Sequence, residues 1–237
     1  MLAQCNFLKS VPVGVRAFSS LNALRATPKK GTLKAGGNAL QESKFEPLSE
    51  AQRAYLDRAL RVNQAGELGA NYIYQGQIFV LSRRHPELRP TLQHMWEQEV
   101  FHHDTFNALQ IKHRVRPSLL TPFWKVGAVA MGAGTALISP EAAMACTEAV
   151  ETVIGGHYNE QLRCLDSQFE QRKADGTSGV PEEVQSLTAK VKLFRDQELE
   201  HLDTAIKHDS RLAVPYMMIT ETIKGVCRLA IWGAERI

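Results

Sequence analysis

A short motif of glutamate and histidine occurs once in each half of the chain. Glu99 and His102 are separated by two residues, as are Glu198 and His201, and a glutamine directly precedes both glutamates. Residues three positions apart lie on one face of an α-helix, so each pair can direct a carboxylate and an imidazole toward one metal ion. A single Glu-x-x-His pair is common on solvated helix faces. Its repetition indicates two helices that face each other across a metal centre.

Two further glutamates complete the ligand pattern of a dimetal bundle. Such a bundle takes one glutamate from each of two helices and one Glu-x-x-His pair from each of the other two. Glu67 precedes the first pair and Glu151 the second, and both lie among small or apolar residues, where a carboxylate needs a compensating partner. Each alone fits a buried, hydrogen-bonded glutamate. As a set, the predicted metal ligands are Glu67, Glu99, His102, Glu151, Glu198 and His201.

Capping signals and prolines predict an all-α fold. Ser49 and Gln52 form a capping box, several prolines stand where helices can begin, and sustained strand alternation is absent. We expect a four-helix bundle made of two helical hairpins, with a flexible loop over residues 173–180. The predicted helices are Glu50–Leu81, Pro86–His113, Pro140–Arg172 and Pro181–His208.

Two segments lie outside the predicted bundle. Residues 126–140 carry no charge but are too few to span a bilayer, and we expect a short apolar connection there. The C-terminal stretch has apolar residues at helical spacing, which predicts an amphipathic interfacial helix. We expect Ile219, Ile223 and Val226 to face lipid, beside a rim of basic side chains from Lys224, Arg228 and Arg236. The alternative is that both segments complete a water-soluble core.

The N-terminal region has the composition of a mitochondrial transit peptide. No acidic residue precedes Glu42, while basic residues alternate with serine, alanine and leucine. We therefore expect residues 1–45 to be a targeting peptide and disordered linker, with 46–237 as one domain; an ordinary disordered basic tail is the alternative. The net charge of +3 depends on this tail and gives no indication of nucleic-acid binding. The cysteines in the predicted domain, at 146, 164 and 227, show no metal-binding spacing and are expected to be reduced.

Five stretches resemble the demethoxyubiquinone hydroxylase family. They are residues 65–71 (AGELGAN), 95–99 (MWEQE), 143–147 (AMACT), 156–159 (GHYN) and 194–201 (FRDQELEH). The resemblance extends from about Tyr55 to the C-terminus, and the six-ligand pattern of the family falls on the six residues given above. It implies a ferritin-like, mitochondrial di-iron monooxygenase of ubiquinone biosynthesis.

The resemblance also implies a substrate, a cofactor and a location. The expected reaction hydroxylates the ring of a demethoxylated polyprenyl benzoquinone or benzoquinol at two iron ions, with electrons ultimately from NADH. Iron also suits a site of carboxylate and imidazole ligands. The expected partners are the quinone, the matrix face of the mitochondrial inner membrane, to which the protein binds peripherally, and a biosynthetic complex that includes a lipid-binding accessory protein. The alternatives are an iron-storage protein, a dimanganese catalase and a non-enzymatic membrane scaffold.

Within the expected site, Glu67, Glu99 and His102 would hold one iron and the other three ligands the second, while the bridging glutamates stay undetermined. His157 and Tyr158 follow Glu151 near the same helix face. They could relay protons or electrons, although a histidine that only supports a ligand is an equal alternative. Glu148 could compete with Glu151, and the family pattern selects Glu151.

Overall fold

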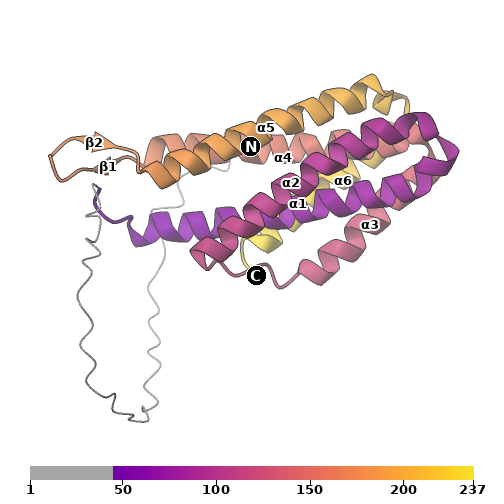
Figure 1. Ribbon diagram of the computed structural model, residues 1–237. Helices are drawn as coiled ribbons and strands as arrows, with labels where there is room; N and C mark the ends of the chain where they lie inside the picture. Colours follow the sequence, from indigo (N-terminus) through magenta and orange to yellow (C-terminus); the bar gives the residue numbers. More distant parts are fainter. Residues whose placement is uncertain (1–44) are drawn as a thin grey trace, which may run out of the picture.

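The computed structural model describes residues 45–237. The predicted targeting peptide lies outside the described residues. Six α-helices dominate the described part of the chain (Figure 1), and the predicted all-α class is confirmed. Short 3-10 turns precede α2 and α6 at Pro86–Leu88 and Ser210–Leu212. The helices are α1 (Glu50–Arg84), α2 (Arg89–His113), α3 (Thr121–Ile138), α4 (Pro140–Gln168), α5 (Glu182–Lys207) and α6 (Tyr216–Ala234).

Helices α1, α2, α4 and α5 form the four-helix bundle. Helix α1 packs along α2, and α4 packs along α5, so the bundle consists of two helical hairpins. The capping box begins α1: the Ser49 hydroxyl accepts a hydrogen bond from the Gln52 backbone N–H, and the Gln52 side chain accepts one from the Ser49 N–H. Aromatic side chains, including Phe106, Tyr158 and Phe194, fill the bundle interior toward one end.

Helix α4 ends at Gln168, four residues before the predicted end at Arg172. The Phe169 side chain is buried against the Tyr55 ring, and Gln52 donates a hydrogen bond to the Gln168 carbonyl, so tertiary contacts end the helix. The chain then forms two antiparallel strands, β1 (Gln171–Arg172) and β2 (Ser178–Gly179), instead of the predicted flexible loop.

Helices α3 and α6 cover the side of the bundle formed by α1 and α4. The predicted apolar connection at 126–140 is in fact most of helix α3, which the Ser139 cap of α4 terminates. Gly76 and Gly132 let α1 and α3 approach closely, because a Cβ on Gly132 would lie 2.0 Å from the Ile73 carbonyl oxygen. A helix that packs this tightly against the bundle is an integral part of the fold.

Helix α6 is amphipathic, as predicted, but its orientation differs from the prediction. Of the three residues expected to face lipid, Val226 is exposed, whereas Ile223 is only 5% exposed and packs in the cluster of Ile73 and Val150, against which Ile219 is also partly buried. The exposed stripe also contains Met218, Leu229 and Trp232. Among the described residues, none of the helices combines the length and apolar character needed to cross a bilayer.

Candidate metal centre

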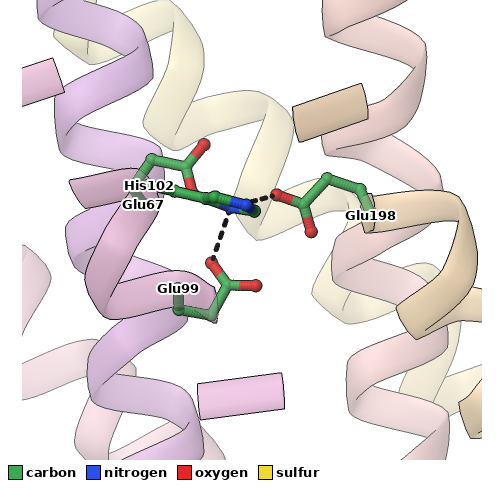
Figure 2. Close-up of side chains that lie close together, drawn as sticks. All are labelled: Glu67, Glu99, His102 and Glu198. Atoms are coloured by element: carbon green, nitrogen blue, oxygen red, sulfur yellow. Dashed lines mark ion pairs between the residues drawn. The ribbon is translucent and has the colours of Figure 1, made fainter. Parts of the chain in front are cut away.

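The six predicted metal ligands meet inside the four-helix bundle. Glu67 comes from α1 and Glu151 from α4, while α2 and α5 each contribute one Glu-x-x-His pair. All six side chains are buried, with exposed fractions of 0 or 1%. In Figure 2 the carboxylates of Glu67, Glu99 and Glu198 surround the His102 ring, and Glu198 reaches it from the opposite hairpin.

The donor atoms form two overlapping groups, each compact enough to surround one metal ion. The first contains Glu67, Glu99, His102 and Glu198, and the second contains Glu99, Glu151, Glu198 and His201. Within each group the donor atoms lie within 4.8 Å of one another. Two glutamates, Glu99 and Glu198, therefore belong to both groups.

The two shared glutamates reach both histidines with different oxygen atoms. Glu198 Oε1 lies 3.2 Å from His102 Nδ1, and its Oε2 lies 3.2 Å from His201 Nδ1. Glu99 Oε1 lies 3.0 Å from His201 Nδ1, and its Oε2 lies 3.9 Å from His102 Nδ1. A carboxylate with one oxygen directed to each group has the geometry of a bridging ligand. The sequence alone left the bridging residues open.

The donor atoms lack other partners. Eight buried side-chain oxygen and nitrogen atoms of these six residues have no hydrogen-bond partner, among them both carboxylate oxygens of Glu99 and Glu198 and the Nδ1 atoms of both histidines. Buried polar atoms are normally satisfied, and leaving so many unpaired would cost several kcal/mol. Four carboxylates and two neutral imidazoles would balance the charge of two divalent cations. The residues therefore fit a dimetal site.

Without metal, the crowding of charge perturbs the carboxylates and imidazoles strongly. Burial, together with repulsion from Glu198, raises the pKa of Glu99 and of Glu151 well above the usual range. Burial alone would raise the pKa of Glu198 too, but its ion pairs with His102 and His201, whose Nδ1 atoms each lie 3.2 Å from one of its oxygens, lower it to about 2. Burial alone would lower the pKa of His102, but the carboxylates of Glu198 and Glu67, at 3.2 and 3.3 Å from its Nδ1, raise it to about 12. In the metal-free protein, protons on these side chains would therefore compensate the negative charge that metal cations would otherwise balance.

Two tyrosines hold the non-bridging glutamates across the bundle. The Tyr158 hydroxyl on α4 donates to Glu67 on α1, and the Tyr74 hydroxyl on α1 donates to Glu151 on α4, at 3.2 Å. Each tyrosine follows the glutamate of its own helix by seven residues. The two hairpins are thus related by pseudo-twofold symmetry, and each provides a tyrosine that hydrogen-bonds the glutamate of the other. Tyr158 was predicted from the sequence, whereas Tyr74 was missed, although the shared seven-residue spacing could have revealed it.

The glutamines that precede the two Glu-x-x-His pairs also contact the opposite hairpin. Gln197 Oε1 lies 2.8 Å from His102 Nε2, and Gln98 Oε1 lies 2.7 Å from His201 Nε2. Each imidazole therefore presents Nδ1 to the carboxylates and Nε2 to a glutamine of the other hairpin. The repeated glutamine was visible in the sequence, but its partner was not.

His157 lies beside the site rather than among the ligands. Its Nε2 is 3.3 Å from Asn63 Oδ1, and burial lowers its pKa to about 4. Asn63 in turn donates to Gln161. Glu148, the competing glutamate, points elsewhere: it accepts hydrogen bonds from Ser210 and from Tyr216, the latter at 2.8 Å. It joins α4 to the segment that leads into α6.

An apolar cavity of about 240 Å³ lies beside the metal centre, between α1, α3, α4 and α6. Its α1 wall includes Gly66 and Gly69, on either side of Glu67 in the sequence, and its α4 wall includes Val150, next to Glu151. A Cβ added at either glycine would have no atom within 4 Å. The same turns of helix thus supply metal ligands to the bundle interior and small side chains to the cavity.

Comparisons with known proteins agree on one family. The model described as "Ubiquinone biosynthesis protein COQ7" matches residues 54–234. A Saccharomyces cerevisiae protein named "5-demethoxyubiquinone hydroxylase, mitochondrial" is 62% identical over 237 residues, which cover 100% of both chains. The Mus musculus "NADPH-dependent 3-demethoxyubiquinone 3-hydroxylase, mitochondrial" is 46% identical over 189 residues, 80% of this chain and 81% of the relative. A Rhodospirillum rubrum "3-demethoxyubiquinol 3-hydroxylase" is 42% identical over 205 residues, 86% of this chain and 89% of the relative.

Proposed function

The chain belongs to the COQ7 family of ubiquinone biosynthesis proteins, and from this membership and its buried carboxylate and histidine site we infer that it is a demethoxyubiquinone hydroxylase. The family resemblance found in the sequence is thereby confirmed. The observation that supports the chemistry most directly is the pair of overlapping ligand groups, because a site of this composition suits redox-active iron.

We propose that the site holds two iron ions. Glu67 and His102 would be terminal ligands of one ion, Glu151 and His201 of the other, and Glu99 and Glu198 would bridge them. Held by these residues, two iron ions would supply the redox chemistry for reducing dioxygen, with one oxygen atom going into a ring hydroxyl group and the other into water. Around them, Tyr158 and Tyr74 hold the terminal carboxylates in place, and the buried aromatic side chains exclude water from the bundle interior.

The reductant is proposed from the relatives. Hydroxylation of the ring by dioxygen, with release of water, requires two electrons and two protons from a donor. The family resemblance led us to expect NADH, but the names of the mammalian relatives specify NADPH, and we propose NADPH for this chain. His157 and Tyr158 stay our proposed relay residues, supported by the hydrogen bond from Tyr158 to Glu67.

We propose that the apolar cavity receives the quinone. Its walls are almost entirely apolar, and it adjoins the helical turns that carry Glu67 and Glu151. Its volume is slightly below the range of about 300–1,000 Å³ common for small-molecule sites. It can therefore enclose part of a polyprenyl quinone, while the rest of the tail extends outside.

We propose that α3 and α6 dock on the mitochondrial inner membrane. Both helices line the cavity, and both expose large apolar side chains, including Phe123 and Val126 on α3 and Met218, Leu229 and Trp232 on α6. Arg228 of α6 and Arg236, just beyond the end of α6, offer positive charge for anionic headgroups. A substrate with a long isoprenoid tail could then enter the cavity directly from lipid. The expected complex with a lipid-binding accessory protein stays a prediction from the family resemblance.

The proposed function is tested with a matched pair of glutamate variants on α4. Glu151→Gln removes a ligand of the ion at His201, so binding of that ion should be strongly weakened and hydroxylation of a demethoxyubiquinone abolished. Glu148→Gln should keep both, because Glu148 contacts Ser210 and Tyr216 instead of the centre; losing one of these hydrogen bonds should cost about 1–3 kcal/mol of stability. Iron content and product formation are measured for both. Full activity in Glu151→Gln would refute the proposed centre.

A further inference from the structure

The two glutamines that precede the Glu-x-x-His pairs contact the histidines in a crossed manner. Gln98 is on α2 and contacts His201 on α5, while Gln197 is on α5 and contacts His102 on α2. Neither glutamine contacts the histidine of its own helix. Both contacts are short, at 2.7 and 2.8 Å, and both involve Nε2, the ring nitrogen that faces away from the carboxylates.

A hydrogen-bond acceptor at Nε2 determines what the other ring nitrogen can do. An imidazole that donates from Nε2 carries its lone pair on Nδ1, and this is the tautomer that binds a metal. In both histidines Nδ1 points at the carboxylates and has no hydrogen-bond partner. The glutamine oxygen thus fixes both the tautomer and the rotation of the ring.

We propose that Gln98 and Gln197 are positioning residues, each of which orients the metal-binding imidazole of the opposite helical hairpin. The proposal rests on the metal centre proposed above and deepens it. Because each iron would take its histidine from one hairpin and the support of that histidine from the other, neither hairpin can bind its ion at full affinity alone.

The neutral amide suits this position. The four carboxylates already balance two divalent cations, and a carboxylate behind each histidine would add uncompensated charge to a buried site. Glutamine supplies the same acceptor without that charge. The crossing also explains why the glutamine is repeated together with the Glu-x-x-His pair: each copy serves the other.

The test measures the affinity for Fe(II), without oxygen or quinone, by anaerobic titration of the metal-free full-length protein. Gln98→Met and Gln197→Met keep the side-chain length but remove the acceptor. Each should weaken the binding of one of the two ions by about 10–100-fold. Gln98→Glu and Gln197→Glu keep an acceptor but add a charge, so they should recover part of the binding that the methionine variants lose. Gln93→Met serves as the matched control, because Gln93 is also on α2 but bonds Glu97 at the surface, and it should bind as the wild type does.

A double-mutant cycle tests the crossing itself. In the His201→Ala background the ion served by Gln98 is already weakened, so Gln98→Met should add little, whereas Gln197→Met should still weaken the ion at His102. If each glutamine acted within its own hairpin, the pattern would be reversed, and the proposal would be overturned. Met variants that bind both ions like the wild type would overturn it too.

Thermal unfolding of the metal-free variants shows whether the fold is intact. If a methionine variant does not fold, Gln98→Asn takes its place, because the shorter amide cannot reach His201 and the same loss is expected. A wild-type protein that binds no Fe(II) would refute the metal centre itself. A wild type that binds two ions beside unaffected glutamine variants would refute only the positioning role.

Discussion

At the scale of single residues, the site is a problem of buried charge. Glu99, Glu151, Glu198 and both histidines lie within a few ångströms of one another and away from water. Because burial and mutual repulsion raise the pKa of Glu99 and Glu151, the metal-free protein keeps protons that the unfolded chain releases. Metal ions would replace those protons, so metal binding and pH must be linked.

This linkage predicts how the stability of the metal-free protein depends on pH. Between pH 7 and 9, the folded state holds a proton on His102, whose pKa is raised to about 12, while a histidine in the unfolded state is mostly neutral; the raised pKa values of Glu99, Glu151 and His201 act in the same direction. A state that binds more protons loses stability as pH rises, so the free energy of unfolding should fall across this range. His157 and Glu198, whose pKa values are lowered, titrate below it.

Denaturant unfolding at several pH values checks this prediction, with the iron-loaded protein as the control. In the loaded protein the ligands are already deprotonated, so its stability should change much less over the same range. A metal-free protein whose stability is constant or rises from pH 7 to 9 would contradict the account of the buried cluster.

At the scale of elements, α1 and α4 serve the metal centre with one face and the apolar cavity with the other. Gly69 lines the cavity, and a Cβ added there would have no other atom within 4 Å. Leucine also has a higher helix propensity than glycine, by about 1 kcal/mol, so it should not destabilise α1. A substitution at position 69 should therefore reduce the cavity volume without impairing folding.

Gly69→Leu should impair the enzyme without disturbing the metal. We expect kcat/KM for demethoxyubiquinone to fall at least about tenfold, which corresponds to about 1.4 kcal/mol of lost transition-state stabilisation. Iron content and the melting temperature should stay at or above the wild-type values. Gly69→Ala adds only a methyl group, so its kcat/KM should lie between those of the wild type and Gly69→Leu. Unchanged kinetics in Gly69→Leu would show that the quinone binds elsewhere.

Two substitutions on α6 distinguish a role in membrane contact from a role in folding. Leu229 is 64% exposed, so Leu229→Asp should leave the fold and iron content intact while it weakens co-sedimentation with anionic liposomes and turnover of a long-tailed quinone. Ile223 is buried, and Ile223→Asp should destabilise the protein by several kcal/mol, because it places an unpaired charge in the core. If Leu229→Asp binds liposomes like the wild type, the membrane surface of α6 is assigned wrongly.

At the scale of the whole molecule, the sequence revealed the features that depend only on local helical spacing. The six candidate ligands and the two hairpins could be predicted, because helical spacing places a Glu-x-x-His pair on one face wherever the helix lies. The crossed contacts of Gln98 and Gln197 could not, since they depend on how the hairpins face each other. Ile223 was assigned to the wrong side because α6 has apolar residues on its exposed surface as well as on its buried surface, and only packing distinguishes the two.

The central claim is that one chain holds two irons joined by Glu99 and Glu198. Mössbauer spectroscopy of the protein loaded with ⁵⁷Fe and oxidised, together with its iron content, tests it most directly. The two overlapping ligand groups predict two irons per chain, in similar oxygen- and nitrogen-rich environments and magnetically coupled to each other. One iron per chain, or two irons that behave as isolated paramagnetic ions, would contradict the account.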